Sequence, residues 1–285
     1  WTTLTGHWAT FRTTRRGMVG LAILTFFVAL AIASPLLVSP DDLDPALASL
    51  PPHMPPSTQA WLGTDNFGRS VLDLLIAGAR VSLLVGITAA LGAMLIGAFV
   101  GISAGYFGGT KLDTFLNAFT NWFLVIPWLA LAIALAAILG ASLVNVIIVI
   151  AITSWASTAR LVRAQALSVR ERPYIERSRA LGGSHWHTVT RHVLPNVFPV
   201  LFANTILMVA LAILSETTLA ILGLSSRTST SWGTIIEDAF TGGAMTAGWW
   251  WWLIPPGVCI VFVTLAFTMV GFAFDEILSP RLRER

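Results

Sequence analysis

Charged residues are scarce in this sequence. They make up 11% of its 285 residues, whereas hydrophobic residues make up 55%. Soluble domains carry about 25% charged residues, so most of this chain cannot face water, and the composition indicates a protein that crosses a membrane several times. Cysteine is also nearly absent. Cys259 is the one example, which excludes an internal disulfide or a cysteine-based metal cluster.

Lysine is equally rare, since Lys111 is the one lysine of the chain. A Walker A phosphate-binding loop needs the pattern G-x-x-x-x-G-K-[ST], in which the lysine reaches the phosphates. Lys111 follows Thr110 rather than a glycine. This ATPase motif is therefore excluded, and if ATP drives the protein, another chain hydrolyses it. The sequence begins at Trp1 rather than methionine, so we expect further N-terminal sequence before it.

Long apolar runs are what the sequence does contain, and a membrane-spanning helix needs about 20 mostly apolar residues. The segments that qualify are 18–38, 80–107, 114–139, 142–159, 197–222 and 253–274. We predict an all-α polytopic membrane protein with six transmembrane helices. Pro127 predicts a kink in the third, because its ring removes a backbone donor. Gly97, Gly101 and Gly105 form overlapping G-x-x-x-G patterns, which predict close packing against another helix.

The basic residues predict the orientation, because cytoplasmic loops of membrane proteins keep an excess of lysine and arginine. Most of the basic residues lie near the two ends of the chain or in segment 160–196, and Lys111 after the second span falls on the same side of the membrane. Arg69, Arg80 and Arg227 fall on the other side. We expect both termini and segment 160–196 to be cytoplasmic, and segments 40–79 and 223–252 to be external. Trp249–Trp252 are typical of an interfacial aromatic belt, with contact to a substrate or binding protein as the alternative.

The segment 160–196 is long for a connection, since loops have a median length of about 4–6 residues. Pro173 suits the first position of a helix, Gly182 and Gly183 suit its end, and Ser184 suits the N-cap of a second helix. Trp186, Val189 and Val193 then follow at helical spacing and form an apolar stripe. Two short capped helices with an apolar stripe indicate a docking surface.

Two other interpretations of this segment are weaker. A basic helix-turn-helix suggests nucleic-acid binding, but the tether between two membrane spans argues against it. His185, His187 and His192 suggest a metal site, but the first two lie on roughly opposite helix faces. We therefore assign no metal or nucleic acid to this segment.

The same segment carries a family resemblance. Glu176-Arg177-Ser178-Arg179-Ala180-Leu181-Gly182, nine further residues and His192-Val193-Leu194-Pro195 resemble the EAA loop of ABC importer permeases. That pattern is E-A-A, three residues, G, nine residues and I-x-L-P. Glu176, Gly182, Leu194 and Pro195 match it in register. Arg177 and Ser178 replace the two alanines, and His192 replaces the isoleucine.

Other motifs narrow the family to the dipeptide/oligopeptide/nickel permeases, and the resemblance is closest to the C-type subunit. It extends over about residues 17–283, through the segments Trp61–Ser70, Gly78–Leu83, Glu216–Leu224 and Ser231–Gly233. It implies the type I ABC importer permease fold. On this basis we expect an N-terminal part, 1–75, with the first span and an external loop, and a five-helix permease core, 76–285.

The resemblance also implies partners and a site. Two related permeases form the pathway, an external binding protein delivers the substrate, and two ATPase subunits or one heterodimer bind ATP and magnesium and receive the loops. This chain itself is then expected to hold no cofactor, metal or catalytic residue and to lie in a bacterial inner membrane. The residues expected to couple it to the ATPase are Glu176, Ala180, Leu181, Gly182, Leu194 and Pro195.

The substrate and one further residue stay open at this stage. Di- and oligopeptides are the default for the family, with nickel or another small solute as the alternative. A stand-alone secondary transporter and a membrane-embedded enzyme are less favoured, because Glu216 is the one obvious charge within a span and no H-E-x-x-H motif occurs. Glu216 is itself a candidate for the pathway or an outer gate, or an interfacial carboxylate bonded to loop backbone.

Overall fold

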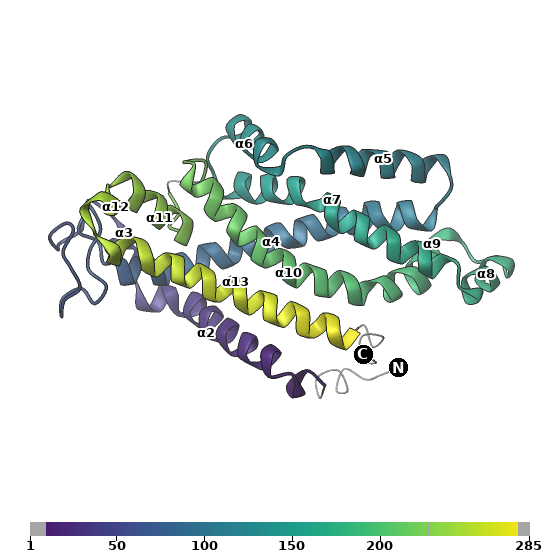
Figure 1. The fold of residues 1–285 in the computed structure, drawn as a ribbon, viewed down its shortest axis with the longest axis horizontal. Coiled ribbons are helices and arrows are strands. Elements are labelled where there is room, and N and C mark those ends of the chain that lie inside the picture. Colours follow the sequence, from purple (N-terminus) through teal and green to yellow (C-terminus); the bar gives the residue numbers. More distant parts are fainter. Residues whose placement is uncertain (1–9, 227, 279–285) are drawn as a thin grey trace.

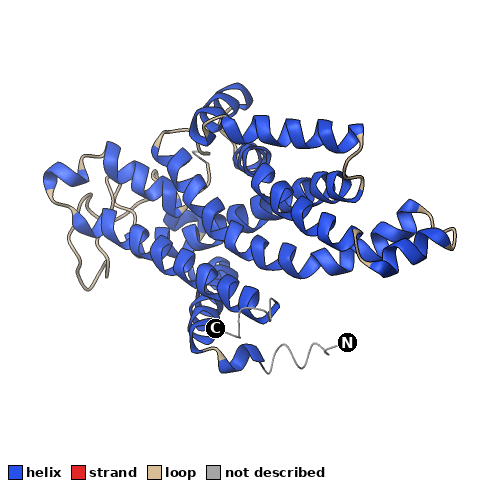
Figure 2. Cartoon of the chain, turned by 45° about the vertical axis from the view of Figure 1, so that its right-hand side comes forward, coloured by secondary structure: helices blue, strands red, loops and turns tan. Residues whose placement is uncertain are grey.

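The computed structural model describes residues 10–226 and 228–278. Apart from one bridge between Thr64 and Ser70, the regular elements in these ranges are helices (Figures 1 and 2). The long helices are α2 (Arg15–Leu37), α4 (Val71–Tyr106), α7 (Leu143–Arg170), α10 (Leu194–Ile221) and α13 (Trp250–Leu278). The shorter elements are α3 (Pro40–Leu43), α5 (Lys111–Val125), α6 (Trp128–Leu139), α8 (Pro173–Ala180), α9 (His185–Thr188), η1 (Val189–Val193), α11 (Trp232–Thr241) and α12 (Ala244–Ala247).

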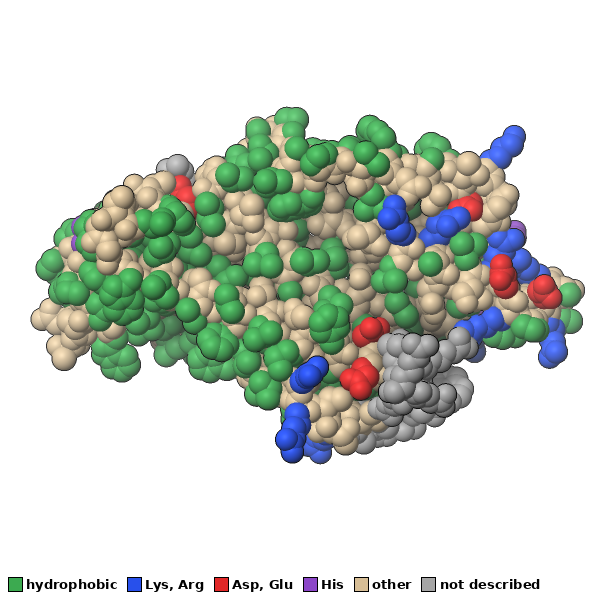
Figure 3. Space-filling view, viewed as in Figure 1, with side chains coloured by type: hydrophobic (Ala, Val, Ile, Leu, Met, Phe, Trp, Pro, Cys, Tyr) green, Lys and Arg blue, Asp and Glu red, His purple; other side chains and the backbone are tan. Residues whose placement is uncertain are grey.

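The long helices lie side by side along one axis, with α8 at one end of the molecule and α11 at the other (Figure 1). Five helices of the described residues are long and apolar enough to cross a membrane, and α5 with α6 gives a sixth crossing if the pair is one broken span. The structure thus confirms the predicted all-α membrane architecture. Apolar side chains cover the middle of the visible face, and charged side chains gather toward the end that carries α8 (Figure 3).

The third predicted span differs from the expectation. Instead of a kinked helix over 114–139, α5 and α6 are separate helices that meet at an angle of 91°. The residue before a proline is disfavoured in the helical region, and Ile126, which precedes Pro127, has extended backbone with φ −69° and ψ 127°. The proline therefore ends α5 at Val125 rather than bending a continuous helix.

Two other helices extend beyond the apolar runs that predicted them. α4 begins at Val71 rather than near 80, and α7 continues to Arg170 rather than ending near 159. Ser70 accepts a hydrogen bond from the Asp73 amide (3.4 Å) and so caps α4. Hydropathy marks the part of a helix that lies in hydrocarbon, whereas the backbone stays helical outside it. The predicted loop 160–196 is therefore helical in its first third.

The second helix predicted in that loop is also part of a span. α9, η1 and α10 form one continuous helix, His185–Ile221. Pro195 lies in the first turn of α10, directly after the π-helical turn η1. Because a proline lacks the amide and clashes with the carbonyl four residues before it, the wider turn lets the helix pass this residue without ending.

The glycines of α4 confirm the predicted close packing. α4 lies against α7, and a Cβ atom at Gly101 would come within 2.6 Å of the Ala159 carbonyl oxygen. A Cβ atom at Gly97 would come within 2.8 Å of the Trp155 carbonyl oxygen. Only glycine allows two helix backbones to approach this closely.

The described ends of the chain lie together at the α8 end. Phe11 packs on Phe274 with ring centroids 5.0 Å apart, and Phe274 also contacts Phe202 near the start of α10 at 5.2 Å. This arrangement matches an even number of crossings. The C-terminal arginines used to predict the orientation, as well as Arg227, lie outside the described residues; they are Arg281, Arg283 and Arg285.

α11 was not predicted, because segment 223–252 was treated as a loop. Ser231 and Thr234 form a capping box at its start, and its buried side chains follow helical spacing. Trp232 is fully buried and donates from Nε1 to the Leu75 carbonyl oxygen (3.0 Å) and from its amide to Ser82 Oγ (3.0 Å). These contacts hold α11 against the N-terminal part of α4.

Candidate functional site

The predicted coupling residues centre on a short loop between α7 and the continuous helix His185–Ile221. We call residues 171–184, which contain α8, the α8 loop. Pro173 is the first residue of α8, and Gly182 has a positive φ of 82°, so glycine ends the helix as expected. The Gly183 amide donates to the Ser178 carbonyl oxygen (2.9 Å). Ser184 accepts from the His187 amide (3.2 Å) and starts the next helix, which confirms the predicted N-cap.

The α8 loop is attached through a small number of contacts. Ile175 is fully buried in a cluster with Tyr106 and Val193. The Arg179 guanidinium lies 4.7 Å from the centroid of the Tyr106 ring, and the Tyr106 hydroxyl is hydrogen-bonded to His185 Nδ1 (2.9 Å). These contacts hold one face of α8 against the ends of α4 and α10.

The opposite face of the α8 loop is exposed. Leu181 is 82% exposed and Trp186, just beyond the loop, is 78% exposed, although large apolar side chains are costly to leave in water. Glu176, Ala180, Leu181 and Gly182 are all exposed, on α8 or directly after it. Leu194 and Pro195 are exposed as well, but they lie in the first turn of α10.

The predicted apolar stripe is therefore divided between two environments. Val193 is fully buried and Val189 packs against the same cluster, whereas Trp186 is exposed and lines a groove beside that cluster with Ile102 and Val189. Of the three residues of the stripe, Trp186 is the exposed one and is therefore available for docking, and the sequence pattern did not show this division.

Glu216 lies at the other end of the molecule, where α10 meets α11. Its side chain is 1% exposed. Ser231 Oγ donates to Glu216 Oε1 (2.6 Å) and also accepts from the Thr234 amide (3.1 Å). The second oxygen, Oε2, has no hydrogen-bond partner. A Cβ atom at Gly233 would come within 3.1 Å of it. The carboxylate thus supports the start of α11, and a role of Glu216 in a gate stays a prediction.

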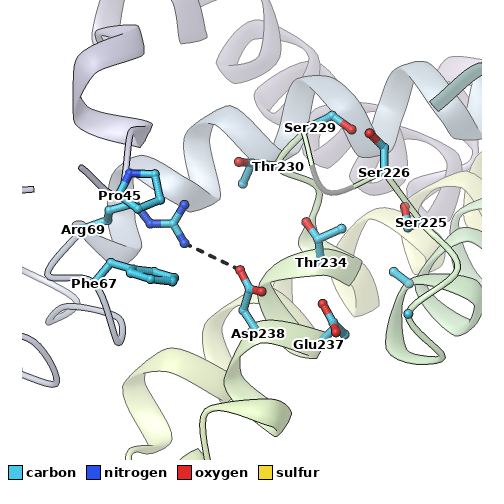
Figure 4. A pocket seen from close by; sticks show the side chains of 12 residues that line it. Pro45, Phe67, Arg69, Ser225, Ser226, Ser229, Thr230, Thr234, Glu237 and Asp238 are labelled. Carbon is cyan, nitrogen blue, oxygen red and sulfur yellow. Dashed lines mark ion pairs between the residues drawn. The ribbon is translucent and has the colours of Figure 1, made fainter. Parts of the chain in front are cut away.

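A cluster of ion pairs holds the segment before α4 in place. The sequence analysis did not predict it. Asp65 is fully buried, and Arg69 donates from Nε to Asp65 Oδ2 (2.6 Å) and from Nη1 to the Leu43 carbonyl oxygen (3.3 Å). Arg69 Nη2 also lies 3.6 Å from Asp238 Oδ2 on α11 (Figure 4). Asp65 and Arg69 lie four residues apart within Trp61–Ser70, one of the segments that carry the family resemblance. This spacing of opposite charges is the signal that could have predicted the pair.

The tryptophan run forms part of the same structure. Trp249 stacks on His53 with ring centroids 3.6 Å apart, and Trp251 Nε1 donates to the Thr64 carbonyl oxygen (3.4 Å). Trp252 is buried. The prediction of a simple aromatic belt is therefore wrong for these three side chains, because segment 39–70 folds over them. We call residues 39–70, α11, α12 and Trp249–Trp252 the α11 cap.

These features define a class of protein. Spans with exposed apolar side chains, an exposed helical loop at one end and a cap held by internal polar contacts at the other describe a polytopic membrane protein.

Comparisons with known proteins identify the family. Residues 97–284 match the family described as binding-protein-dependent transport system inner membrane component, and residues 3–56 match the N-terminal transmembrane domain of oligopeptide transport permease C. The dipeptide transport system permease protein DppC of Alkalihalophilus pseudofirmus is 35% identical over 93% of this chain and 86% of its own length. The oligopeptide transport system permease protein OppC of Bacillus subtilis is 32% identical over 96% of this chain and 88% of its own.

A solved structure agrees on the fold. A chain of the inward-facing MetNI methionine ABC transporter aligns with a TM-score of 0.56 at 21% identity, over 74% of this chain and 97% of that chain. The present chain belongs to the family of inner membrane components of binding-protein-dependent transport systems. It is a permease subunit with the fold of an ABC importer permease, and its family is one of transport components.

Proposed function

We propose that this chain is the C-type permease of an ATP-driven importer of di- and oligopeptides in a bacterial inner membrane. Relatives that are 32–35% identical over more than nine-tenths of the chain are named as dipeptide and oligopeptide permeases, which supports the peptide substrate. A related permease forms the pathway with it, and an external binding protein delivers the peptide. ATP and magnesium are bound by the partner ATPases, since this chain has no Walker A motif.

The observation that carries the coupling part of the proposal is the exposed surface of the α8 loop. Glu176 and Leu181 are exposed on α8 and at its end, Trp186 is exposed on α9, and the other face of α8 is anchored by the buried Ile175. Large apolar side chains on a polar-rimmed surface are typical of interaction sites. In the proposed mechanism the ATPase receives this surface in a groove, and closure of the ATPase dimer moves α7 and α10 through the anchor. The α8 end and both termini are then cytoplasmic, and the α11 cap faces the binding protein.

A matched pair of glycine variants tests the coupling surface. Gly182 and Gly223 both end helices with a positive φ, 82° and 72°, and a Cβ atom at either would meet nothing within 4 Å. The backbone strain of Gly182→Val and Gly223→Val is therefore similar, but the two residues lie at opposite ends of the molecule. We expect Gly182→Val to lose the ATPase subunits on co-purification and Gly223→Val to keep them. Retention of the ATPases by both variants would refute docking at the α8 loop.

Transport itself is tested with the whole complex in proteoliposomes. We expect uptake of a labelled dipeptide to require ATP, the ATPases and the binding protein together. Uptake of nickel but not of the dipeptide would favour the alternative substrate. Uptake by this chain without ATPases, driven by an ion gradient, would overturn the importer mechanism in favour of a secondary transporter.

A further inference from the structure

Two sides of the helix bundle present different chemistry to their surroundings. α2 and α13 expose large apolar side chains, such as Ile32 at 75% and Val261 and Phe272 at 61%, as a lipid-facing surface requires. The side formed by α5, α6, α7 and α10 also exposes apolar side chains, such as Val125 at 81% and Leu211 at 56%, but it adds a helix break and a row of hydroxyl groups. The break is unfavourable in contact with lipid.

The break between α5 and α6 lies at membrane depth. α5 has 15 residues and is therefore about 22 Å long at 1.5 Å per residue, within a hydrocarbon core of about 30 Å. Its start is marked by Asp113, which forms a two-fold hydrogen-bonded pair with Arg163 (2.7 and 3.0 Å). Its end at Val125 is 81% exposed. A break leaves the last carbonyls of one helix and the first amides of the next without helical partners, and such backbone is tolerated only against protein or water.

A groove of about 400 Å3 runs beside this break. Leu124 and Trp128 flank the break and line the groove together with α7 and α10. The hydroxyl-bearing residues in its lining are Thr153, Ser154, Ser157, Ser215 and Thr218. None of the residues that line the groove is charged.

The hydroxyl groups of this groove leave acceptor positions open. Ser215 donates to the Leu211 carbonyl oxygen (2.8 Å), Thr218 to the Leu214 carbonyl oxygen (2.8 Å) and Ser157 to the Ser154 carbonyl oxygen (3.1 Å). Each proton is thus used within its own helix, whereas a hydroxyl oxygen has two lone pairs. Water or the amide groups of a solute can donate to the remaining lone pairs.

We infer that this groove is one wall of the aqueous passage, and that the α5–α6 break faces the passage rather than lipid. The inference rests on the proposed function, since the second permease supplies the opposite wall. An uncharged wall of hydroxyl-bearing and apolar side chains, the latter including Met208 and Leu211, hydrogen-bonds to the backbone of a peptide without selecting the charge of its side chains. The groove therefore fits peptides of varied sequence better than a metal cation.

Thiol labelling tests the inference directly, because Cys259 is the one cysteine of the chain. Cys259→Ser removes the cysteine of this chain, and labelling of this subunit after Ser157→Cys, Ser215→Cys or Thr218→Cys then reports on the groove. Val261→Cys and Phe272→Cys on α13 are the matched lipid-facing controls. The full complex in membrane vesicles is treated with a charged methanethiosulfonate, which needs water and an ionised thiol, and labelling after denaturation confirms that each cysteine is present.

We expect the groove cysteines to react at least about tenfold faster than the two controls, and ATP to change their rates. Equal labelling rates for the groove cysteines and the α13 controls would overturn the inference. Groove cysteines that react only with a lipid-soluble maleimide would overturn it too. The absence of any reaction in the native complex would overturn it as well, because the groove would then be buried against protein. Dipeptide uptake in the same vesicles separates the two proposals. Uptake without groove labelling refutes only the passage, and labelling without ATP-driven uptake refutes only the importer function.

Discussion

The two ends of the molecule differ in how their side chains are held. In the α11 cap, charged and aromatic side chains find partners within the chain, as in Arg69 with Asp65 and His53 with Trp249. In the α8 loop, Ile175 provides the buried anchor, and Leu181 and Glu176 are exposed. Surfaces that are satisfied internally favour rigidity, whereas exposed apolar side chains on a short helix favour a partner. The comparison indicates that contacts within the chain hold the shape of the cap, which also exposes Trp61 and Met245, and that the loop is built to be held by another protein.

The largest expected effect on stability is in the cap. Arg69→Ala leaves the fully buried Asp65 without its ionic partner, and breaking a buried pair costs about 3–5 kcal/mol. We expect a sharp loss of thermal stability of the purified complex, measured by size-exclusion chromatography after heating. Arg80→Ala, which removes an exposed arginine nearby on α4, is the control and leaves stability unchanged. Equal behaviour of the two variants would mean that the cap is not held by its ion pairs.

The anchor of the α8 loop has the next largest effect. Ile175→Ala creates a cavity in the cluster around Tyr106 and Val193, and such truncations cost about 2–5 kcal/mol. We expect a lower unfolding temperature together with weaker ATPase co-purification, because α8 loses its fixed position. A stable Ile175→Ala chain would show that the loop does not depend on this anchor.

Removal of the hydroxyl of Ser231 has a smaller effect within the cap. Ser231→Ala deletes the N-cap of α11 and the bond to the Glu216 carboxylate, and together these losses cost about 1–3 kcal/mol. Ser229→Ala, in the same connection, is the comparison variant. Thermal unfolding of both in detergent measures the difference, and a smaller loss for Ser231→Ala than for Ser229→Ala would contradict the assigned role.

The smallest effect on stability is expected at the exposed tip of the loop. Leu181 is 82% exposed, so Leu181→Ala changes stability by less than about 0.5 kcal/mol. Truncation of an apolar hot spot costs about 2 kcal/mol of binding free energy, or about 30-fold in affinity. Titration of the ATPase onto the reconstituted permease measures this affinity. An unchanged affinity would place the docking contact elsewhere.

The sequence predicted the parts of this fold that depend on local chemistry. Apolar runs located the spans, and Pro173, Gly182 and Ser184 located the ends of the loop helices. α11 was missed although its signals were present: a Ser231–Thr234 capping box precedes buried residues at helical spacing. The broken third span was expected only as a kink, although the restriction that Pro127 places on Ile126 is itself local.

Other features could not be derived from local patterns, because they join residues distant in the chain. Arg69 meets Asp238 on α11, and Asp113 meets Arg163 on α7. The sequence placed Leu194 and Pro195 with the coupling residues, but the structure places them in α10 because the helix continues through η1. The exposed tip at Leu181 and the buried anchor at Ile175 were not distinguished, since the contrast depends on packing against α4.

Photo-cross-linking tests the contrast between the two ends most directly. A photoreactive amino acid replaces either Leu181 in the α8 loop or Leu222 at the end of α10, beside the α11 cap. Both side chains are exposed. Each variant is irradiated in the complete complex in its membrane. The account predicts that irradiation joins the Leu181 variant to the ATPase and that the Leu222 variant yields no such product. A cross-link to the ATPase from position 222 and none from position 181 would contradict it.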